Sequence, residues 1–485
     1  MARRTNYKRI FILTLSFIII SVCVFFGIQF ITKTGVFKVP GIVIYDESLS
    51  EEEKNTLQAI FTEETELDKD VKISAYETNE RPELKEGEFI TEITVPVADY
   101  YDIREDVSEY APNEYKEISV NDLTDKVKLL KKDDKYFLDD PNSGATFRIL
   151  TFTSEKYKDE IGPLVKDKYT KTFPTSDTIL TFAQTGVTAM SRGMNKKLAE
   201  VGDAKYFSEK IADYLAGFDL THTSNESSFS DYATSSNICS DHRFMDTLNH
   251  IGLDIVELTG NHNVDCGDEA ASNTIDTYTE NNIKIVGGGK SADEAKVPLE
   301  INEKNTGITM LAYNLSTGGA TTDDTPGANE YNEENAKQEI ANAKARGDIV
   351  IVDIQYYECA AYASEYEDNT CDYADSSAGD QVGFFHHLID LGADVVVGTS
   401  AHQPQTYELY GDGAIYYGLG NLFFDQVWWP GTTRSLILAH YFYNGKLLQT
   451  KVIPTIYDSN MQTRIYEEAP ARAFLARLIS ERPRQ

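Results

Sequence analysis

Acidic, amide and imidazole side chains recur at the ends of apolar runs in this sequence. Glu226 follows DLTHTSN, Asn261 and His262 follow DIVELTG, and His402 follows ADVVVGTSA. This set of four suits Zn, Mn or Fe better than Ca, and three or four protein ligands are enough to hold one such ion. A bound metal would polarise a phosphoryl or carbonyl oxygen, with His262, His402 and Glu226 as the candidate catalytic residues.

The elements expected to position these residues are strands and helices that alternate after Ser176. Apolar runs such as 178–185 (TILTFAQT) predict strands, and runs such as 205–217 (KYFSEKIADYLAG) predict helices. Right-handed crossovers then build a sheet with helices on both faces, and the carboxyl ends of its parallel strands meet at one edge. We therefore expect the four candidate ligands to converge at that edge.

The C-terminal part of this region has a different sequence pattern. Residues 414–425 and 435–457 predict strands without helices between them, and an Asn-Gly pair at 444–445 predicts a hairpin turn. A mixed sheet or a second sheet should follow. An aromatic stretch beside these strands would line a pocket for a glycan or peptide polymer, although core packing explains its phenylalanines equally well. The candidate substrate-binding residues are Asn421, Trp428 and Trp429.

Four short motifs group the candidate residues. They are Ser224-Asn225-Glu226, Gly260-Asn261-His262 with Asp265-Cys266-Gly267, Gly398-Thr399-Ser400-Ala401-His402, and Leu419-Gly420-Asn421-Leu422-Phe423-Phe424-Asp425. In order and spacing they resemble the bacterial CapA family of capsule and poly-γ-glutamate synthesis proteins. That family's fold looks like the calcineurin-type metallophosphoesterases, so the resemblance implies an α/β, metallophosphoesterase-like mixed-sheet sandwich flanked by helices. It also implies two metals that generate a hydroxide nucleophile.

This sequence departs from the family pattern at three ligand positions. Residues 184–186 read QTG where the family has Gly-Asp, residues 355–357 read QYY where it has His-Trp-Gly, and Ser400 replaces the first histidine of His-x-His. Thr185 and Gln355 should mark lost ligands at the same edge. Two hypotheses follow: a hydrolase or transferase with a single divalent metal, or a non-catalytic polymer-binding or assembly module whose site is vestigial and binds none.

The N-terminus predicts a membrane anchor. Residues 10–31 form an uncharged apolar run of roughly the 20 residues that cross a bilayer, and residues 1–9 carry basic side chains that favour a cytoplasmic tail. A cleaved signal peptide is the alternative, but no Ala-x-Ala type site follows the run. We expect a single-pass protein of the cell membrane with its bulk extracellular.

The rest of the chain divides into three further segments. Short apolar runs and charged helical stretches over 38–170 predict a small α/β accessory domain, in which Ser50 and Glu53 have the spacing of a capping box. Residues 176–460 form the CapA-like domain. Residues 461–485 are expected to be a C-terminal tail.

The net charge excludes one class of function, and a missing motif residue excludes another. With 45 basic and 78 acidic residues, the net charge of −33 opposes binding to nucleic acid. The run GGGKS at 287–291 is not a nucleotide-binding loop, because Lys284 stands where the first glycine of that motif belongs. The expected partners are the cell membrane, an envelope polymer and capsule synthesis proteins.

Four of the five cysteines follow the apolar run, where an extracellular location would allow disulfides. Cys359 and Cys371 flank a segment rich in Tyr, Glu and Asp, and we predict that they pair. Free structural cysteines are the alternative.

Overall fold

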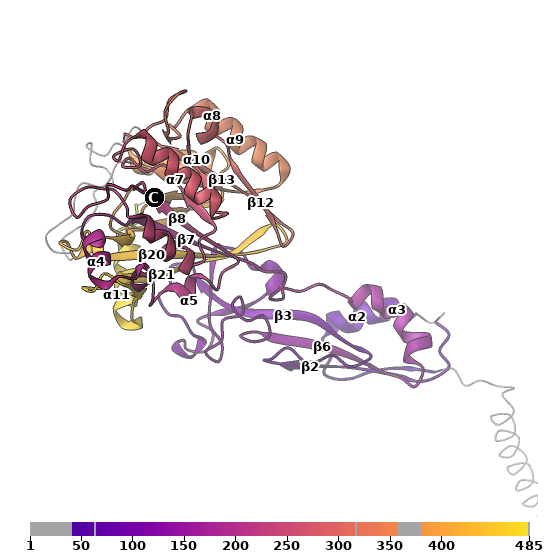
Figure 1. Cartoon of the computed structure of the whole chain (residues 1–485). Helices are drawn as coiled ribbons and strands as arrows, with labels where there is room; N and C mark the ends of the chain where they lie inside the picture. The colour runs from indigo at the N-terminus through magenta and orange to yellow at the C-terminus, as the bar shows by residue number, and fades with distance from the viewer. Residues whose placement is uncertain (1–40, 63–64, 316–317, 357–379, 484–485) are drawn as a thin grey trace, which may run out of the picture. The chain divides into compact units, whose positions relative to one another are not determined.

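The computed structural model describes residues 41–62, 65–315, 318–356 and 380–483. It is a mixed α/β protein, and its chain separates into two compact units (Figure 1). The smaller unit contains the chain up to Thr94 together with Ala145–Phe173, and the larger unit contains Val95–Gly144 and Pro174–Gln485.

The smaller unit packs helices on a sheet. Ser50 caps its first helix, because its side chain accepts from the Glu53 N–H while Glu53 accepts from the Ser50 N–H, as the spacing predicts. A core of Leu57, Ile73 and Phe152 joins the helices to the sheet. The elements are β1 (Val43–Tyr45), α2 (Glu51–Ile60), β2 (Val71–Thr78), β3 (Glu88–Asp99, of which residues 88–94 belong to this unit), β6 (Thr146–Thr153) and α3 (Gly162–Tyr169).

Residues 95–144 group with the larger unit rather than with the expected accessory domain over 38–170. The reason lies in buried polar contacts that the sequence pattern does not reveal. The Tyr100 and Tyr416 hydroxyls hydrogen-bond at 2.8 Å, and the Leu129 N–H donates to Gln449 Oε1 at 2.7 Å. This segment contains β4 (Lys116–Ser119) and β5 (Val127–Leu129).

The larger unit contains two main sheets with an apolar core between them. The first has the order β10-β9-β8-β7-β20-β21-β22 with β19 paired to β7, and the second has the order β12-β13-β15-β16-β18-β17. Residues such as Phe182, Ile255, Met310 and Val397 fill the space between them. The strands are β7 (Leu180–Ala189), β8 (Leu220–Asn225), β9 (Ile255–Glu257), β10 (Lys284–Val286), β12 (Leu299–Glu303), β13 (Thr306–Asn314), β15 (Ile349–Gln355), β16 (Val395–Gly398), β17 (Tyr407–Tyr410), β18 (Gly413–Tyr416), β19 (Asn421–Phe424), β20 (Arg434–Tyr443), β21 (Lys446–Tyr457) and β22 (Thr463–Ile465).

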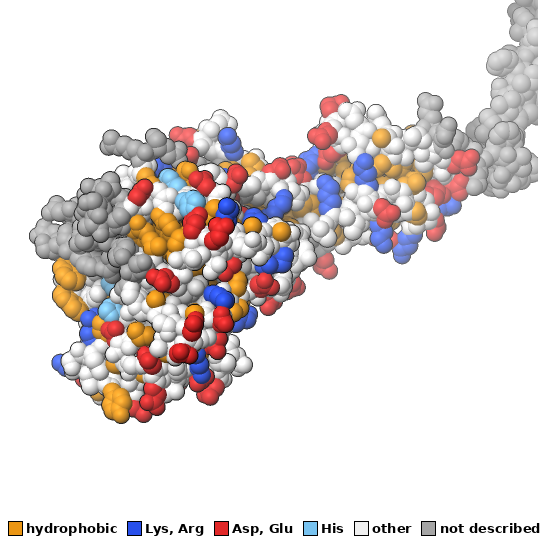
Figure 2. Space-filling view, turned by 90° about the horizontal axis from the view of Figure 1, so that it is seen from above, with side chains coloured by type: hydrophobic (Ala, Val, Ile, Leu, Met, Phe, Trp, Pro, Cys, Tyr) orange, Lys and Arg blue, Asp and Glu red, His pale blue; other side chains and the backbone are white. Residues whose placement is uncertain are grey.

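Helices flank these sheets. Ile340 of α9 and Phe385 of α10 pack on the second sheet against Val350 and Val396 (Figure 1). The helices are α4 (Gly193–Val201), α5 (Ala212–Leu215), α6 (Met245–His250), α7 (Asp268–Glu280), α8 (Ala292–Ala295), α9 (Glu333–Arg346), α10 (Gln381–Asp390) and α11 (Glu468–Ser480). Acidic and basic side chains are interspersed over the face shown in Figure 2.

Most of the expected elements are present, with one clear correction near the C-terminus. Strands β7 to β10 are parallel neighbours, and β20 and β21 form the expected hairpin around Asn444-Gly445. Residues 461–485, expected to be a tail, instead contain β22 and α11. Helix α11 belongs to the fold because Phe474, Leu475 and Leu478 are buried in the core between the sheets.

The glycine run at 287–291 has a structural role. Gly287 adopts φ +74°, and a Cβ there would lie 2.5 Å from Thr259 Cγ2. Gly288–Gly289 forms β11, which pairs with β14 (Gly327–Ala328). Within the described ranges, no helix is long and apolar enough to cross a membrane. The predicted anchor at 10–31 lies outside those ranges.

Candidate functional site

Two parallel strands of each sheet end in the motif residues. Glu226 directly follows β8, Asn261 lies four residues after β9, Gln355 ends β15, and His402 lies four residues after β16. Gly260 allows the loop after β9 to approach β8 closely, because a Cβ on it would lie 2.7 Å from Glu226 Cγ. Parallel strands thus deliver polar groups to one place, as the alternating pattern predicts.

The side-chain amide of Gln355 lies between two of the predicted metal ligands. Its Nε2 donates to Glu226 Oε1 at 3.2 Å and to Asn261 Oδ1 at 3.2 Å. Thr399 Oγ1 donates to Gln355 Oε1 at 3.5 Å, which orients the amide. Glu226 and Gln355 are both buried, so this amide is the immediate environment of the Glu226 carboxylate.

His402 forms the other side of the cluster. Its Nδ1 lies 2.9 Å from Asn421 Oδ1, and the Asn421 amide nitrogen donates to the Thr432 carbonyl at 3.1 Å. This orientation of Asn421 makes His402 Nδ1 the donor and leaves Nε2 as the acceptor in the neutral ring. His402 Nε2 lies 3.8 Å from Glu226 Oε2, so the two buried groups are close to each other but beyond hydrogen-bond distance.

His262 is placed differently from the other three predicted ligands. Its Nδ1 lies 2.8 Å from Asp265 Oδ2, and its side chain is one third exposed. The described contacts join Glu226, Asn261 and His402 through Gln355 and the histidine–glutamate pair, whereas they join His262 to its own loop. The catalytic and ligand roles assigned to these four residues remain predictions.

The positions of the expected lost ligands have separate explanations. Thr185 Oγ1 donates to the His222 carbonyl at 2.8 Å, so this side chain lies within the sheet beside β8 rather than with Gln355. A register irregularity between Gln184 and Val187 accompanies this placement. Tyr356 packs against two aromatic rings of α10. Its ring centroid lies 5.7 Å from those of Phe384 and Phe385.

The arrangement does not fit the Zn, Mn or Fe site that the sequence predicts. Across the described ranges, no group of three His, Cys, Asp or Glu residues is arranged to hold a metal ion. The Gln355 amide turns N–H groups, which cannot ligate a cation, toward the Glu226 and Asn261 oxygens. An amide thus occupies the place where a metal would meet these two oxygens.

A second polar cluster lies deep between the sheets, and the sequence analysis missed it. Gln184 Nε2 donates to Asp353 Oδ1 at 2.5 Å, His222 Nε2 lies 3.2 Å from Asp353 Oδ2, and His440 Nε2 lies 3.2 Å from Gln184 Oε1. All are fully buried. Burial and the charge of Asp353 raise the pKa of Glu257 to about 7, whereas burial and His222 lower the pKa of His440 to about 3. The sequence signal that could have revealed this cluster is the presence of polar residues at inward-facing positions of otherwise apolar strands.

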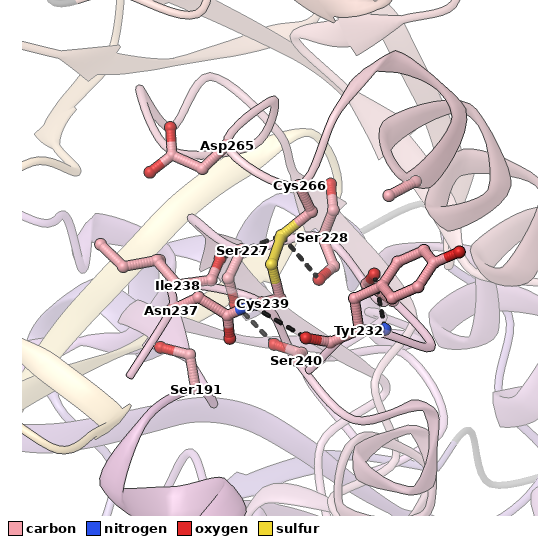
Figure 3. Close-up of a disulfide and its surroundings, with 12 residues drawn as sticks. Ser191, Ser227, Ser228, Tyr232, Asn237, Ile238, Cys239, Ser240, Asp265 and Cys266 are labelled. Atoms are coloured by element: carbon pink, nitrogen blue, oxygen red, sulfur yellow. Dashed lines mark hydrogen bonds between the residues drawn. A yellow bond between two sulfur atoms is a disulfide. The ribbon is translucent and has the colours of Figure 1, made fainter. Parts of the chain in front are cut away.

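A disulfide fastens the loops that carry the site. Cys239 and Cys266 are bonded, and their Cα atoms are 5.8 Å apart (Figure 3). Ser227 and Ser240 Oγ atoms lie 2.6 Å apart beside it, and Ser228 Oγ donates to the Asn263 carbonyl. The bond therefore joins the loop after Glu226 to the loop that carries Asn261 and His262. The predicted Cys359–Cys371 pair lies outside the described residues.

The predicted substrate-binding residues lie at two depths. Asn421 is buried and orients His402, whereas Trp428 is 56% exposed. The Trp428 and Trp429 rings stack with centroids 6.0 Å apart. Trp428 therefore has an accessible aromatic surface, which core packing does not explain.

The fold is an α/β sandwich of two facing mixed sheets flanked by helices. The polar motif residues follow its parallel strands. Residues 181–426, just over half of the chain, match the family described as bacterial capsule synthesis protein PGA_cap. The chain belongs to this family, and the predicted resemblance to CapA is confirmed.

Curated relatives agree with this assignment. The PGA biosynthesis protein CapA of Bacillus subtilis is 25% identical over 279 residues, which cover 56% of this chain and 70% of that protein. The capsule biosynthesis protein CapA of Bacillus anthracis is 26% identical over 200 residues, covering 40% and 46%. A probable polyglutamine synthesis accessory protein of Mycobacterium tuberculosis is 28% identical over 182 residues, covering 35% and 44%. The chain thus spans less than half the length of the latter two relatives.

Proposed function

We propose that this protein is a membrane-anchored, extracytoplasmic protein of capsule or poly-γ-glutamate biosynthesis that engages the polymer without catalysis. It would act as a polymer-binding or assembly module of an envelope complex. The family assignment supports the pathway. The Gln355 amide between Glu226 and Asn261 supports the absence of catalysis, because it satisfies with hydrogen bonds the oxygens that a metal would otherwise bind.

Two independent features of the chain support the proposed location. The apolar run at 10–31 with basic residues before it favours an anchor whose N-terminus is cytoplasmic. The Cys239–Cys266 disulfide favours an oxidising compartment, because thiols in the cytosol are kept reduced. Both features support an extracytoplasmic location for the larger unit.

A hydrolase or transferase is the second candidate, and the chain of Glu226, His402 and Asn421 favours it. Asn421 holds the proton on His402 Nδ1, so His402 Nε2 can accept a proton and Glu226 can stabilise the resulting imidazolium. This arrangement resembles that of a general base more than that of a packed core histidine. Proton transfer at His402 Nε2 is therefore the step that these residues can perform themselves.

Genetic complementation separates the two candidates. The gene would be deleted in the producing bacterium and replaced by the wild-type chain, Glu226→Gln or His402→Asn, and cell-bound polymer would be measured. A non-catalytic module should tolerate Glu226→Gln, which preserves shape, and the purified wild-type chain should not cleave γ-linked oligoglutamate. Loss of polymer in the Gln variant, at normal protein level, together with cleavage by the wild-type chain, would establish the enzyme instead. Unchanged polymer in the deletion strain would refute both candidates.

A further inference from the structure

A row of neighbouring side chains, here called the stack, connects the buried His402 to the exposed Trp428. Its members are His402, Phe424, Arg192 and Trp428. The His402 ring lies 5.1 Å from the Phe424 ring. The guanidinium carbon of Arg192 lies 4.7 Å from the centroid of Phe424 and 5.6 Å from that of Trp428. A guanidinium within about 6 Å of an aromatic centroid is attracted to that ring, and here the Trp428 ring is accessible. The stack gives the site an outward extension.

Asp425 holds Arg192 in one orientation. Arg192 Nε donates to Asp425 Oδ1 at 3.0 Å and Nη2 donates to the same oxygen, while Asp425 Oδ2 accepts from the Gly193 N–H at 2.8 Å. The Asp425 side chain is only 8% exposed. Arg192 itself adopts φ +47°, a positive value that is uncommon for arginine and persists only where neighbours enforce it. The guanidinium is thus pre-oriented, which lowers the entropy lost when it binds a ligand.

Arg192 retains donors for a ligand. Its Nη1 takes part in no hydrogen bond with the described residues, and its side chain is 24% exposed. Because Asp425 neutralises its charge, the guanidinium offers directed N–H groups more than a net positive field. Directed donors of this kind select planar acceptors, and carboxylates are the best match.

We infer that Arg192 and Trp428 form a subsite for one γ-glutamyl unit of the polymer, an inference that rests on the proposed function. The free α-carboxylate of the unit accepts from Arg192 Nη1, and its methylene groups and amide plane lie on the Trp428 ring. A neutral sugar would also stack on Trp428, but it would leave the Arg192 donors without a charged acceptor. The unit bound here lies at the outer end of the stack that leads to His402 and Glu226.

The chain supplies its own probe for this subsite. Its two tryptophans are both in this segment, so intrinsic tryptophan fluorescence reports binding here. The full chain, purified in detergent, would be titrated with a short γ-linked oligoglutamate at low salt. We expect a saturable change in fluorescence that persists when salt is added, because the Arg192 donors are directed and Asp425 neutralises their charge.

Two variants test the contacts, and a third is the control. Arg192→Lys keeps the charge but loses the planar fork, so we expect affinity to fall about 10-fold or more. Trp428→Leu changes an exposed residue, leaves Trp429 as the reporter, and should weaken binding by a similar factor. Arg346→Lys is the matched control, because Arg346 also pairs with an aspartate, Asp348 at 2.9 Å, and should leave binding unchanged. Thermal unfolding of each variant verifies that it is folded.

Each other outcome overturns the inference. It fails if oligoglutamate causes no saturable change, or if Arg192→Lys binds as well as the wild type. Saturable binding of a neutral oligosaccharide that does not depend on Arg192 would make this subsite a glycan site instead. The proposed function is judged separately, by polymer in the deletion strain, so the subsite can fail while that function stands.

Discussion

Gln355 distinguishes this site from a metal centre at the level of one side chain. Its two amide hydrogens point at oxygens of Glu226 and Asn261, and Thr399 fixes its orientation. A carboxylate in the same position would present lone pairs and a negative charge to the same space. The identity of this residue therefore decides whether the cluster is held by hydrogen bonds or requires a cation.

Gln355→Glu should create a metal requirement. The variant places two buried carboxylates together, so it should be less stable without metal and should bind Mn²⁺ or Zn²⁺ at least about 10-fold more tightly than the wild type. Calorimetric titration of the metal-stripped full chain, and the increase in thermal midpoint with metal, measure both effects. Gln338→Glu, on the exposed face of α9, is the charge-matched control. Equal metal affinity in the wild type and the Gln355 variant would contradict this interpretation.

Glu257 makes stability depend on pH. Its folded pKa of about 7 lies above the ordinary value of 4.5, because it is buried beside Asp353. The protonated form is the stable one, so its contribution is complete below pH 4.5 and is lost as pH rises through 7. For a fully buried group this corresponds to on the order of 3 kcal/mol. Glu257→Gln should remove that loss, measured as the difference between urea unfolding free energies of variant and wild type from pH 5 to pH 8.

His440 provides the internal contrast for the same measurement. Its folded pKa of about 3 lies below the ordinary 6.5, so its contribution is present above pH 6.5 and decreases as the pH falls toward 3. The two groups therefore act in opposite directions between pH 4.5 and 6.5. Only the Glu257 contribution should change as the pH rises from 6.5 through 7, because His440 is neutral there in both the folded and the unfolded chain. A wild-type stability that stays constant from pH 6 to pH 8 would show that Glu257 is ionised without cost.

At the scale of elements, the site depends on two loops that follow the paired strands β8 and β9. The Cys239–Cys266 bond and the contact from Ser228 to Asn263 hold them together. The loop after β8 carries Glu226, and the loop after β9 carries Asn261. Covalent attachment thus limits the relative motion of two members of the cluster.

Replacement of both Cys239 and Cys266 by Ser should destabilise the folded chain by roughly 3 kcal/mol, because a disulfide that closes a loop of this length restricts the unfolded state. Urea unfolding with and without reductant measures this. Reductant should lower wild-type stability toward that of the variant. Replacement of Cys359 and Cys371 measures separately the contribution of the pair that the sequence predicts. Non-reducing mass spectrometry of the same proteins tests whether those two cysteines pair, as the sequence predicts.

At the scale of the whole molecule, the net charge limits how the chain can contact a charged polymer. The net charge of −33 disfavours a wide contact with any polyanion, so polymer contact should be confined to local donors such as Arg192. Added salt screens this long-range repulsion, so polymer binding by the full chain should not weaken from low to moderate salt.

The predicted anchor has its own test. The full chain should remain in the membrane fraction after washing with salt or alkali and should require detergent for extraction, because residues 10–31 would cross the bilayer. External protease should then digest the larger unit in intact, wall-stripped cells. Recovery of a soluble, secreted chain whose N-terminus begins after the apolar run would establish a cleaved signal peptide instead.

The sequence by itself determined the family, the parallel strands and the positions of the motifs, because these depend on local periodicity and on residues close together in the chain. Glu226, Asn261 and His402 were placed at strand ends by that reasoning, and contacts in the structure join them. The helix cap at Ser50 and the hairpin at Asn444-Gly445 were predictable for the same local reason.

Only the tertiary structure decided what those residues face. Gln355 lies 129 residues from Glu226 in the chain, and no local pattern indicates that its amide would lie between Glu226 and Asn261. The same holds for the buried Gln184–Asp353 contact, for the Cys239–Cys266 pairing and for α11, whose apolar side belongs to the core. Such contacts depend on how two sheets pack face to face, and packing brings together residues whose sequence separation carries no information about their distance.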